Sequence, residues 1–247
     1  MIAIFTHATA TQTAEAAASQ VADALRAKPD LVLGLATGGT MRPFNAALVR
    51  LHREGKLSFA RTTIFNLDDH VGVQAAHPQS FRRFMRETLF DLVDADPACC
   101  FMPDGMASNL DAEAASYEAR IAAAGGIDLQ ILGLGHNGHI AYNEPGAPHD
   151  SRTRAVVLSA DTVMRAAPDF APGPVPSRGL TMGIGTILTA RRIVLIAHGA
   201  GKAEAVAQSL RPPPRIECPA SALQRHRDVA FYLDMEASAL LEAKAQD

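Results

Sequence analysis

The sequence has no tryptophan, three cysteines and only four lysines among its 247 residues. Three cysteines without a C-x-x-C pair make neither a disulfide framework nor a zinc site. No stretch approaches the roughly 18 consecutive apolar residues of a membrane span, and the start M-I-A-I-F-T-H lacks the charged region of a signal peptide. We therefore expect a soluble protein of the reducing cytoplasm.

The sequence also has no large excess of either charge. Its 23 basic and 26 acidic residues leave a net charge of −3. This balance predicts no contact with nucleic acid or with an anionic membrane. The hydrophobic content of 48% is enough for a large core and excludes a disordered or fibrous chain. Because the sequence shows no repeat and no linker, we expect residues 1–247 to form a single domain.

Short apolar runs alternate with longer amphipathic segments along the chain. Six runs are typical of buried strands: Ile2–Phe5, Leu31–Leu35, Thr62–Asn66, Ile127–Leu132, Arg192–Ala197 and Val229–Leu233. The segments between them include helical patterns at Thr11–Lys28, from the T-G-G-T motif to about Arg53, at Ser80–Val93 and at Ser108–Ala124. Unalternating strands separated by helices indicate a parallel sheet covered on both faces. The predicted fold class is α/β, a three-layer α/β/α domain with a mostly parallel, Rossmann-like sheet.

Polar and glycine-rich motifs follow four of these strands. In chain order they are T-G-G-T at 37–40, N-L-D-D-H at 66–70, G-L-G-H-N-G-H at 133–139 and H-G-A-G-K at 198–202. In a parallel sheet the carboxyl ends of the strands share one edge, where open α/β folds bind their ligands. We expect the four motifs to meet in one crevice.

The first and last of these motifs suit a phosphate. Thr37, Gly38, Gly39 and Thr40 offer backbone N–H groups, two hydroxyls and a helix N-terminus. A tight turn explains the same glycines, and Lys202 alone could be a solvated lysine at a helix start. A helix dipole disfavours a cation there, however. Together the two motifs predict a phosphate site with Lys202 as the counter-charge.

The two middle motifs suit acid/base chemistry. Asp68 is a candidate general base at the crevice, although one of two adjacent carboxylates commonly caps the next segment. Glu144 could hold His139 in one tautomer and leave its other nitrogen facing the crevice. The spacing of the histidines and Glu144 fits no zinc site, so we expect no metal.

The stretch Gly133–Gly138 matches the dinucleotide pattern G-x-G-x-x-G. That pattern must open a helix, and Pro145 and Gly146 break any helix early. We reject a dinucleotide cofactor on this ground. A phosphate cradle, a carboxylate base and an oriented histidine instead suit proton transfer on a sugar phosphate.

Several motifs together resemble one family, the glucosamine-6-phosphate deaminases (isomerases), which are related to the 6-phosphogluconolactonases. The matching segments are L-G-L-A-T-G-G-T at 33–40, F-N-L-D-D-H-V-G at 65–72, H-P-Q-S-F at 77–81, G-L-G-H-N-G-H-I-A-Y-N-E-P-G at 133–146, S-R-T-R at 151–154, L-T-M-G-I-G-T-I at 180–187 and P-A-S-A-L-Q at 219–224. N-E-P-G separates the chain from the lactonases. The resemblance runs from about residue 30 to residue 235.

The resemblance implies a cofactor-free conversion of glucosamine 6-phosphate and water to fructose 6-phosphate and ammonia. By position, His139 would open the pyranose ring with Glu144 and Asn137 in its relay, and Asp68 would move a proton between C2 and C1. The implied substrate-binding residues are Thr37, Gly38, Gly39, Thr40, Asp69 and Lys202.

The chain departs from the family pattern at several positions. Asn137 stands where many members carry an aspartate, and an amide orients an imidazole without lending it charge. Pro168 stands where an arginine that reaches the phosphate is expected, and Arg165 is one helical turn earlier. Residues that build an allosteric site for N-acetylglucosamine 6-phosphate are replaced by Ala147, Pro148 and Val156, so we expect no such activation. The oligomeric state stays open.

The segment from about Arg154 to Thr181 is predicted to be a mobile lid, with the proline-rich stretch Pro168–Pro176 as a surface flap. A plain surface loop explains the same composition. Three other functions remain as alternatives: deamination of galactosamine 6-phosphate, lactone hydrolysis, and sugar-phosphate sensing by a regulatory domain. Lactone hydrolysis and sugar-phosphate sensing would leave Asp68, His139 and Glu144 without a common function.

Overall fold

Seven parallel strands form the centre of the structure. The computed structural model describes residues 2–241. Within them the strands follow the order β1-β10-β9-β6-β2-β3-β5, and every neighbouring pair is parallel. Their bounds are β1 (Ile2–His7), β2 (Val32–Leu35), β3 (Thr63–Asn66), β5 (Cys100–Phe101), β6 (Leu129–Gly133), β9 (Arg192–Ala197) and β10 (Val229–Asp234). All six predicted strands lie in this sheet, which confirms the mostly parallel α/β fold.

After β1, which lies at one edge, the chain fills the sheet from its centre outward in two directions. β2, β3 and β5 succeed one another toward one edge, whereas β6, β9 and β10 succeed one another toward the other. The strand order therefore reverses between the neighbours β2 and β6. In open parallel sheets such a reversal creates a crevice at the carboxyl ends of the strands. The loops after Leu35 and Gly133 begin at this crevice.

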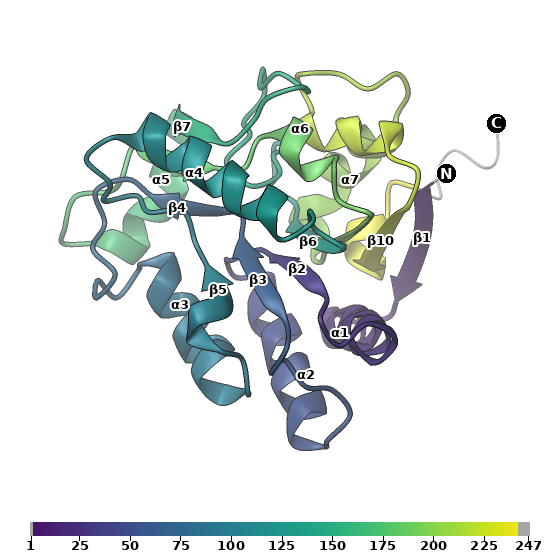
Figure 1. Cartoon of the computed structure of the whole chain (residues 1–247). Helices are drawn as coiled ribbons and strands as arrows, with labels where there is room; N and C mark the ends of the chain where they lie inside the picture. The colour runs from purple at the N-terminus through teal and green to yellow at the C-terminus, as the bar shows by residue number, and fades with distance from the viewer. Residues whose placement is uncertain (1, 242–247) are drawn as a thin grey trace.

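Helices cover both faces of the large sheet (Figure 1). On one side lie α1 (Ala10–Ala27), α2 (Met41–Arg53) and α3 (Phe81–Thr88). On the other lie α4 (Leu110–Ala123), α6 (Ile184–Ile187) and α7 (Ala203–Leu210), with the short α8 (Met235–Ser238) beside α7. The three layers are those that the sequence predicts.

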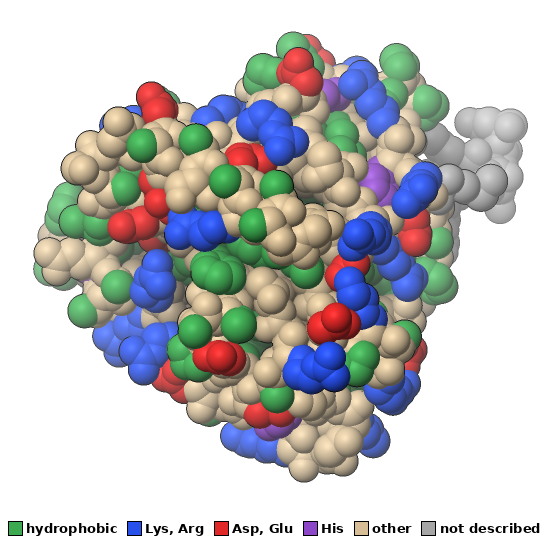
Figure 2. Space-filling model, in the orientation of Figure 1, with side chains coloured by type: hydrophobic (Ala, Val, Ile, Leu, Met, Phe, Trp, Pro, Cys, Tyr) green, Lys and Arg blue, Asp and Glu red, His purple; other side chains and the backbone are tan. Residues whose placement is uncertain are grey.

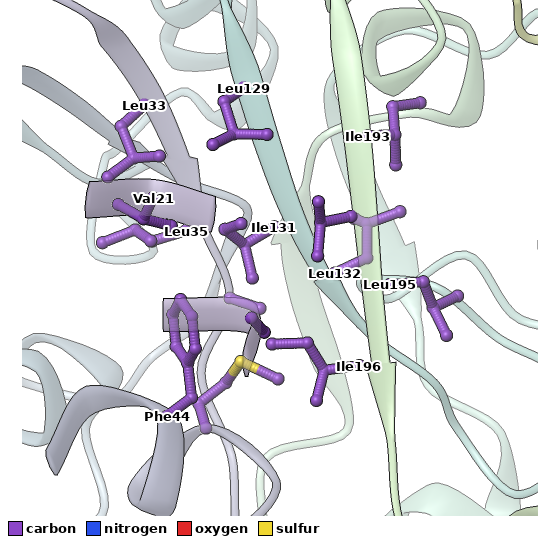
Figure 3. Close-up of a cluster of buried hydrophobic side chains, with 14 of the residues drawn as sticks. Val21, Leu33, Leu35, Phe44, Leu129, Ile131, Leu132, Ile193, Leu195 and Ile196 are labelled. Atoms are coloured by element: carbon purple, nitrogen blue, oxygen red, sulfur yellow. The ribbon is translucent and has the colours of Figure 1, made fainter. Parts of the chain in front are cut away.

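The core covers both faces of the central strands, and Figure 3 shows a part of it that includes Val21 of α1 and Phe44 of α2. All four residues of β2 are buried, as a strand covered on both faces requires. α1 is capped by the Thr9 hydroxyl, which accepts a hydrogen bond from the Gln12 amide, and its buried residues recur every three or four positions. On the α1 and α2 side the fully buried residues include Val21, Leu33, Leu35, Phe44, Ile131 and Ile196, whereas Leu132 and Leu195 point to the opposite face of the sheet.

Strand β4 (Asp68–His70) begins a second sheet, one residue after β3 ends. This sheet has three antiparallel strands in the order β4-β8-β7, with β8 at Arg178–Thr181 and β7 at Arg154–Val157. The sequence analysis missed these three strands and also β5. The three strands of the small sheet are three or four residues long and carry charged side chains, and β5 has only two residues, so none of the four shows a clear apolar run or alternation.

The predicted lid segment 154–181 is more regular than its composition suggests. It contains β7, then α5 (Ala160–Phe170), then β8. The Ser159 hydroxyl caps α5 by accepting a hydrogen bond from the Thr162 amide at 3.2 Å, and Pro168 lies inside the helix rather than in a loop. The stretch 171–177 is irregular. Movement of the lid stays a prediction.

The helix predicted at Ser80–Val93 is too long by about one turn. α3 ends at Thr88, because Leu89 leaves the helical conformation with φ −145° and is fully buried. A short 3-10 turn, η1 (Phe90–Leu92), follows. The surface carries basic and acidic side chains interspersed over the face shown in Figure 2. Among residues 2–241, no helix is both long and apolar enough to span a bilayer.

Asp128 ties together the amino-terminal ends of the central strands, opposite the crevice. Its side chain is 8% exposed. One carboxylate oxygen accepts hydrogen bonds from the Val32 amide at 2.8 Å and from Lys28 Nζ at 2.6 Å, and the other pairs with Arg191. Burial alone would raise the pKa of Asp128, but these donors outweigh it and lower that pKa below its ordinary value.

We expect Asp128→Asn to lower the free energy of unfolding by about 2 kcal/mol, because it leaves a buried backbone donor and two cations without their charged acceptor. Urea unfolding would measure the loss. A lowered folded-state pKa stabilises the fold above the unfolded pKa, and this stabilisation is lost as pH falls through the folded one. The difference between the two proteins should therefore shrink in acid. A difference that stays constant, or an equal loss in the exposed control Asp30→Asn, would contradict this role.

Candidate active site

Four loops at the carboxyl edge of the large sheet enclose a cavity of about 260 Å³. They follow β2, β3, β6 and β9, as the four sequence motifs predict. Of the candidate residues, the structure brings together around this cavity Thr37, Gly38, Gly39, Thr40, Asp68, His139 and Lys202, with His136 beside them. Asn137 and Glu144 lie directly behind His139.

The loop 37–40 forms one end of the cavity and begins α2. Gly38 has φ +100°, a conformation that side chains other than glycine rarely adopt. Thr40 is the cap residue of α2, but its hydroxyl makes no capping bond, and the first turn of α2 carries no acidic residue. The first amides of α2 and the Thr40 hydroxyl can therefore be directed at an anion.

Lys202 also lines the cavity and supplies positive charge to it. Burial lowers its pKa, and the positive charge of Arg165, on α5, lowers it further. Arg165 is also paired with Asp161 in the helical turn before it, at 3.2 Å. Lys202 and Arg165 thus lie within each other's field, and an anion between them would stabilise both charges.

Asp68 lies at the other side of the cavity, on β4. Its side chain is 6% exposed, and none of the hydrogen bonds among residues 2–241 reaches its carboxyl group. Burial is the main cause that raises its pKa to about 8, and the neighbouring charge of Asp69 raises it as well. A carboxyl group that titrates near neutral pH suits a proton acceptor and donor.

His139 is held by an amide bridge to a carboxylate. Asn137 Oδ1 lies 2.8 Å from His139 Nδ1, and Asn137 Nδ2 donates to Glu144 Oε2 at 2.9 Å. Glu144 Oε2 itself lies 3.6 Å from His139 Nδ1. The acceptor on Asn137 places a proton on Nδ1, which leaves Nε2 for the cavity. A Cβ on Gly135 would lie 2.3 Å from the imidazole, so only glycine leaves room for the ring there.

Glu144 is also bonded to the lid helix through its second oxygen. Ser159 Oγ donates to Glu144 Oε1 at 3.1 Å, and the Thr162 hydroxyl donates to the same oxygen. Burial alone would raise the pKa of Glu144, but the nearby imidazole of His139 and the hydrogen bonds from Thr162 and Asn137 lower it to about 2. Glu144 is therefore a permanent anion near neutral pH, in contrast to Asp68.

Asp69, expected to bind the substrate, lies elsewhere. Successive side chains of a strand point to opposite faces, so Asp68 and Asp69 cannot both face one cavity. Asp69 accepts a hydrogen bond from the His70 amide at 2.9 Å and lines a separate cavity with Arg82 and Asp104. We therefore remove Asp69 from the candidate site.

Two aromatic residues of the cavity escaped the sequence analysis. Phe81 and Tyr142 both line it, and their rings stack at 5.9 Å between centroids. In the sequence, Tyr142 lies inside the motif at 133–146 and Phe81 ends the motif H-P-Q-S-F, and neither motif assigns these residues to the cavity. His136, which also lines the cavity, pairs with Asp161 of α5.

The fold and the site define a three-layer α/β/α protein with an anion cradle and an acid/base pair in one crevice. The family model described as glucosamine-6-phosphate isomerases/6-phosphogluconolactonase matches residues 6–231, and the chain belongs to this family. The resemblance inferred from the motifs is thereby confirmed.

Individual relatives agree with the family match. The chain is 51% identical over 236 residues to a glucosamine-6-phosphate deaminase of Rhodopirellula baltica, with 94% of each chain covered. It is 44% identical over 227 residues to glucosamine-6-phosphate deaminase 1 of Giardia intestinalis, covering 91% of this chain and 85% of that one.

Solved structures agree as well. A monomeric glucosamine-6-phosphate deaminase superposes with a TM-score of 0.94 at 41% identity, covering 97% of this chain and 100% of that one. The 6-phosphogluconolactonase of Trypanosoma brucei superposes with a TM-score of 0.75 at 22% identity, covering 98% and 99%. The latter shows a shared fold.

The cradle predicts how an anion should bind. We expect Lys202→Met to weaken binding of a hexose 6-phosphate by about tenfold to a hundredfold, the value of one charge-assisted hydrogen bond. Calorimetric titration with fructose 6-phosphate measures this change. Lys56→Met is the matched control, because Lys56 is exposed and paired with Glu54 at 2.7 Å. Equal affinities of the Lys202 variant and the control would contradict the cradle.

Proposed function

We propose that this protein converts glucosamine 6-phosphate and water into fructose 6-phosphate and ammonia. The observation that carries the proposal is that one cavity holds a buried carboxyl group, an oriented histidine and an anion cradle. Relatives named glucosamine-6-phosphate deaminase, at up to 51% identity over most of the chain, support the choice of substrate.

The cradle holds the phosphate of the substrate in this proposal. Backbone amides of Gly38 and Gly39, the hydroxyls of Thr37 and Thr40, and Lys202 are its ligands. Arg165 adds a second cation from the lid helix and takes the part expected of an arginine at the position of Pro168. With the phosphate on C6 fixed at this end, the length of the sugar brings C1 and C2 toward Asp68 and His139.

His139 opens the pyranose ring. Its Nε2 accepts the proton of the O1 hydroxyl and delivers a proton to the ring oxygen O5 while the C1–O5 bond breaks, so that C1 becomes an aldehyde. Asn137 fixes the imidazole, and the negative charge of Glu144 stabilises the imidazolium through that amide. Asn137 is suited to this bridge because it accepts from His139 and donates to Glu144 at once, which an ionised aspartate cannot do.

Asp68 then carries out the isomerisation. Its carboxylate takes the proton from C2, the electron pair of that C–H bond forms a C1–C2 double bond, and the aldehyde oxygen takes a proton from the ammonium group of the substrate. The resulting enolamine receives the Asp68 proton at C1, which leaves an iminium group at C2. Water hydrolyses this group to the ketone and ammonia. These are proton transfers, so we propose no cofactor and no metal.

The remaining parts of the proposal follow from the reaction. Because water enters and a C–N bond is cleaved, the enzyme is a hydrolase of C–N bonds as well as an isomerase. Its partner is a small amino-sugar phosphate in the cytoplasm. The lid at 154–181 covers the bound sugar and excludes bulk water.

The direct test is the release of ammonia and fructose 6-phosphate from glucosamine 6-phosphate. We expect turnover by the unmodified protein and a loss of at least about a hundredfold in kcat for Asp68→Asn, because an amide cannot accept the C2 proton. Fructose 6-phosphate binding should persist in this variant. Turnover of galactosamine 6-phosphate alone would move the proposal to that epimer, and binding without turnover of either sugar would contradict an enzyme.

The raised pKa of Asp68 predicts a pH dependence. Only the ionised carboxylate accepts a proton, so kcat/KM should rise with pH through a pKa of about 8. Asp69→Asn removes one of the two causes of the raised pKa and should move this limb toward lower pH. The substrate is the same in both profiles, so its own amine cannot produce the difference. Superimposable profiles would contradict the assignment.

A further inference from the structure

A second cavity of about 420 Å³ lies next to the catalytic one, between the start of α2, the helix α3 and the lid helix α5. The two cavities share four lining residues, Gly38, Gly39, Phe81 and Tyr142. Asp68 lines only the first. The second has polar lining, including Arg42 and Asp169, and is therefore a place where water is stable.

The side chains shared by the two cavities are two aromatic rings. Phe81 and Tyr142 stack with an interplanar angle of 20° and a centroid separation of 5.9 Å. Tyr142 is 9% exposed. Their only neighbours in the shared boundary are glycines, which have no side chains. The apolar part of this boundary therefore consists of the two rings.

Tyr142 is fixed in this place at three points. Its amide donates to Thr181 Oγ1 at 3.1 Å, and its hydroxyl lies 3.1 Å from His70 Nδ1. Its ring packs over Gly179, where a Cβ would come within 2.5 Å of the ring. Thr181 pairs with Asp68, and Gly179 pairs with His70, in the antiparallel register of β8 with β4. The small sheet thus holds the Tyr142 ring and the catalytic carboxyl group in one rigid unit.

His70 completes the arrangement without adding charge. Its imidazole lies among Phe81, Tyr142 and Phe170, with centroids 4.4, 5.6 and 5.4 Å away. Burial lowers its pKa to about 4, with a further contribution from His77, so it is neutral near pH 7. A neutral partner fixes the Tyr142 hydroxyl without placing a cation near Asp68.

We propose that the stacked rings of Phe81 and Tyr142 form a wall that keeps water in the second cavity away from Asp68, so that the proton taken from C2 reaches C1 before it exchanges with solvent. This inference rests on the proposed function, because it concerns the proton that Asp68 carries in that reaction. Both residues act through Asp68 and neither reacts with the sugar. Burial of Asp68, the main cause of its raised pKa, agrees with a boundary that limits the access of water to its carboxyl group.

The deuterium retained at C1 of the product shows whether the wall keeps water away from Asp68. When Asp68 removes deuterium from C2, the C–D bond breaks and an O–D bond forms on the carboxyl group. That deuterium is then either delivered to C1 or replaced by hydrogen from water. The fraction retained at C1 therefore measures how fast delivery is relative to exchange, whatever the overall rate.

The experiment uses glucosamine 6-phosphate deuterated at C2, in ordinary water, at low conversion. Mass spectrometry of the fructose 6-phosphate measures the deuterium at C1. We expect retention in the unmodified protein and a fall of at least about twofold in the retained fraction for Tyr142→Ala and for Phe81→Ala, since each opens the wall to water. Phe84→Ala is the matched control, because Phe84 lines the second cavity but not the first.

Each outcome decides a separate point. Absence of product from the unmodified protein overturns the proposed function. Product without deuterium at C1 in that protein overturns the wall, as does a retained fraction unchanged in both wall variants or lowered equally by Phe84→Ala. If circular dichroism shows that Tyr142→Ala does not fold, Phe81→Ala decides alone, since Phe81 is only partly buried at the start of α3.

Discussion

The geometry of the site depends on the two backbone hydrogen bonds of Leu67. Its amide donates to the Leu35 carbonyl at 3.1 Å, and its carbonyl accepts from the Met182 amide at 2.7 Å. The first bond belongs to the edge of the large sheet and the second to the small one. Leu67 is therefore the point at which the chain passes from one sheet to the other. Asp68, the next residue, is carried over the carboxyl ends of the strands and buried there.

Two carboxyl groups near this junction have opposite properties for simple physical reasons. Asp68 is buried beside another carboxylate, and no group of residues 2–241 donates a hydrogen bond to it, so its pKa rises to about 8. Glu144 is also shielded from water, but His139, Thr162 and Asn137 favour its charged form, and its pKa falls to about 2. Environments that separate two pKa values in this way assign one group to proton transfer and the other to electrostatic support.

All strands of the large sheet except β5 could be predicted from the sequence because they are continuous apolar runs, and polar motifs follow four of them. The same rule placed Thr37–Thr40, Asp68, His139 and Lys202 at one edge without any knowledge of tertiary structure. Asn137 and Glu144 could be predicted because they belong to the same motif as His139.

The small sheet could not be predicted, because Asp68, Asp69 and His70 form a strand through their partners in β8 and not through their own composition. For that reason the sequence alone predicts Asp69 beside Asp68 in the substrate site. Knowledge of the strand would have separated them, since neighbours on a strand face opposite sides. Tyr142 and Phe81 were missed for a related reason. They meet only when β8 brings Gly179 under the Tyr142 ring, and no local pattern records that contact.

The lid helix α5 contacts the site through residues at both of its ends. Near its start, Thr162 bonds to Glu144 and Asp161 pairs with His136. At its other end, Phe170 lies against His70 at 5.4 Å between ring centroids and lines the second cavity. A displacement of α5 would remove a donor that lowers the pKa of Glu144 and would uncover the imidazole that holds Tyr142. The support of His139 and the shielding of Asp68 thus depend on one helix, although the two groups lie on different loops. We therefore propose that a closed lid supports both groups at once, over and above any contact that it makes with the sugar.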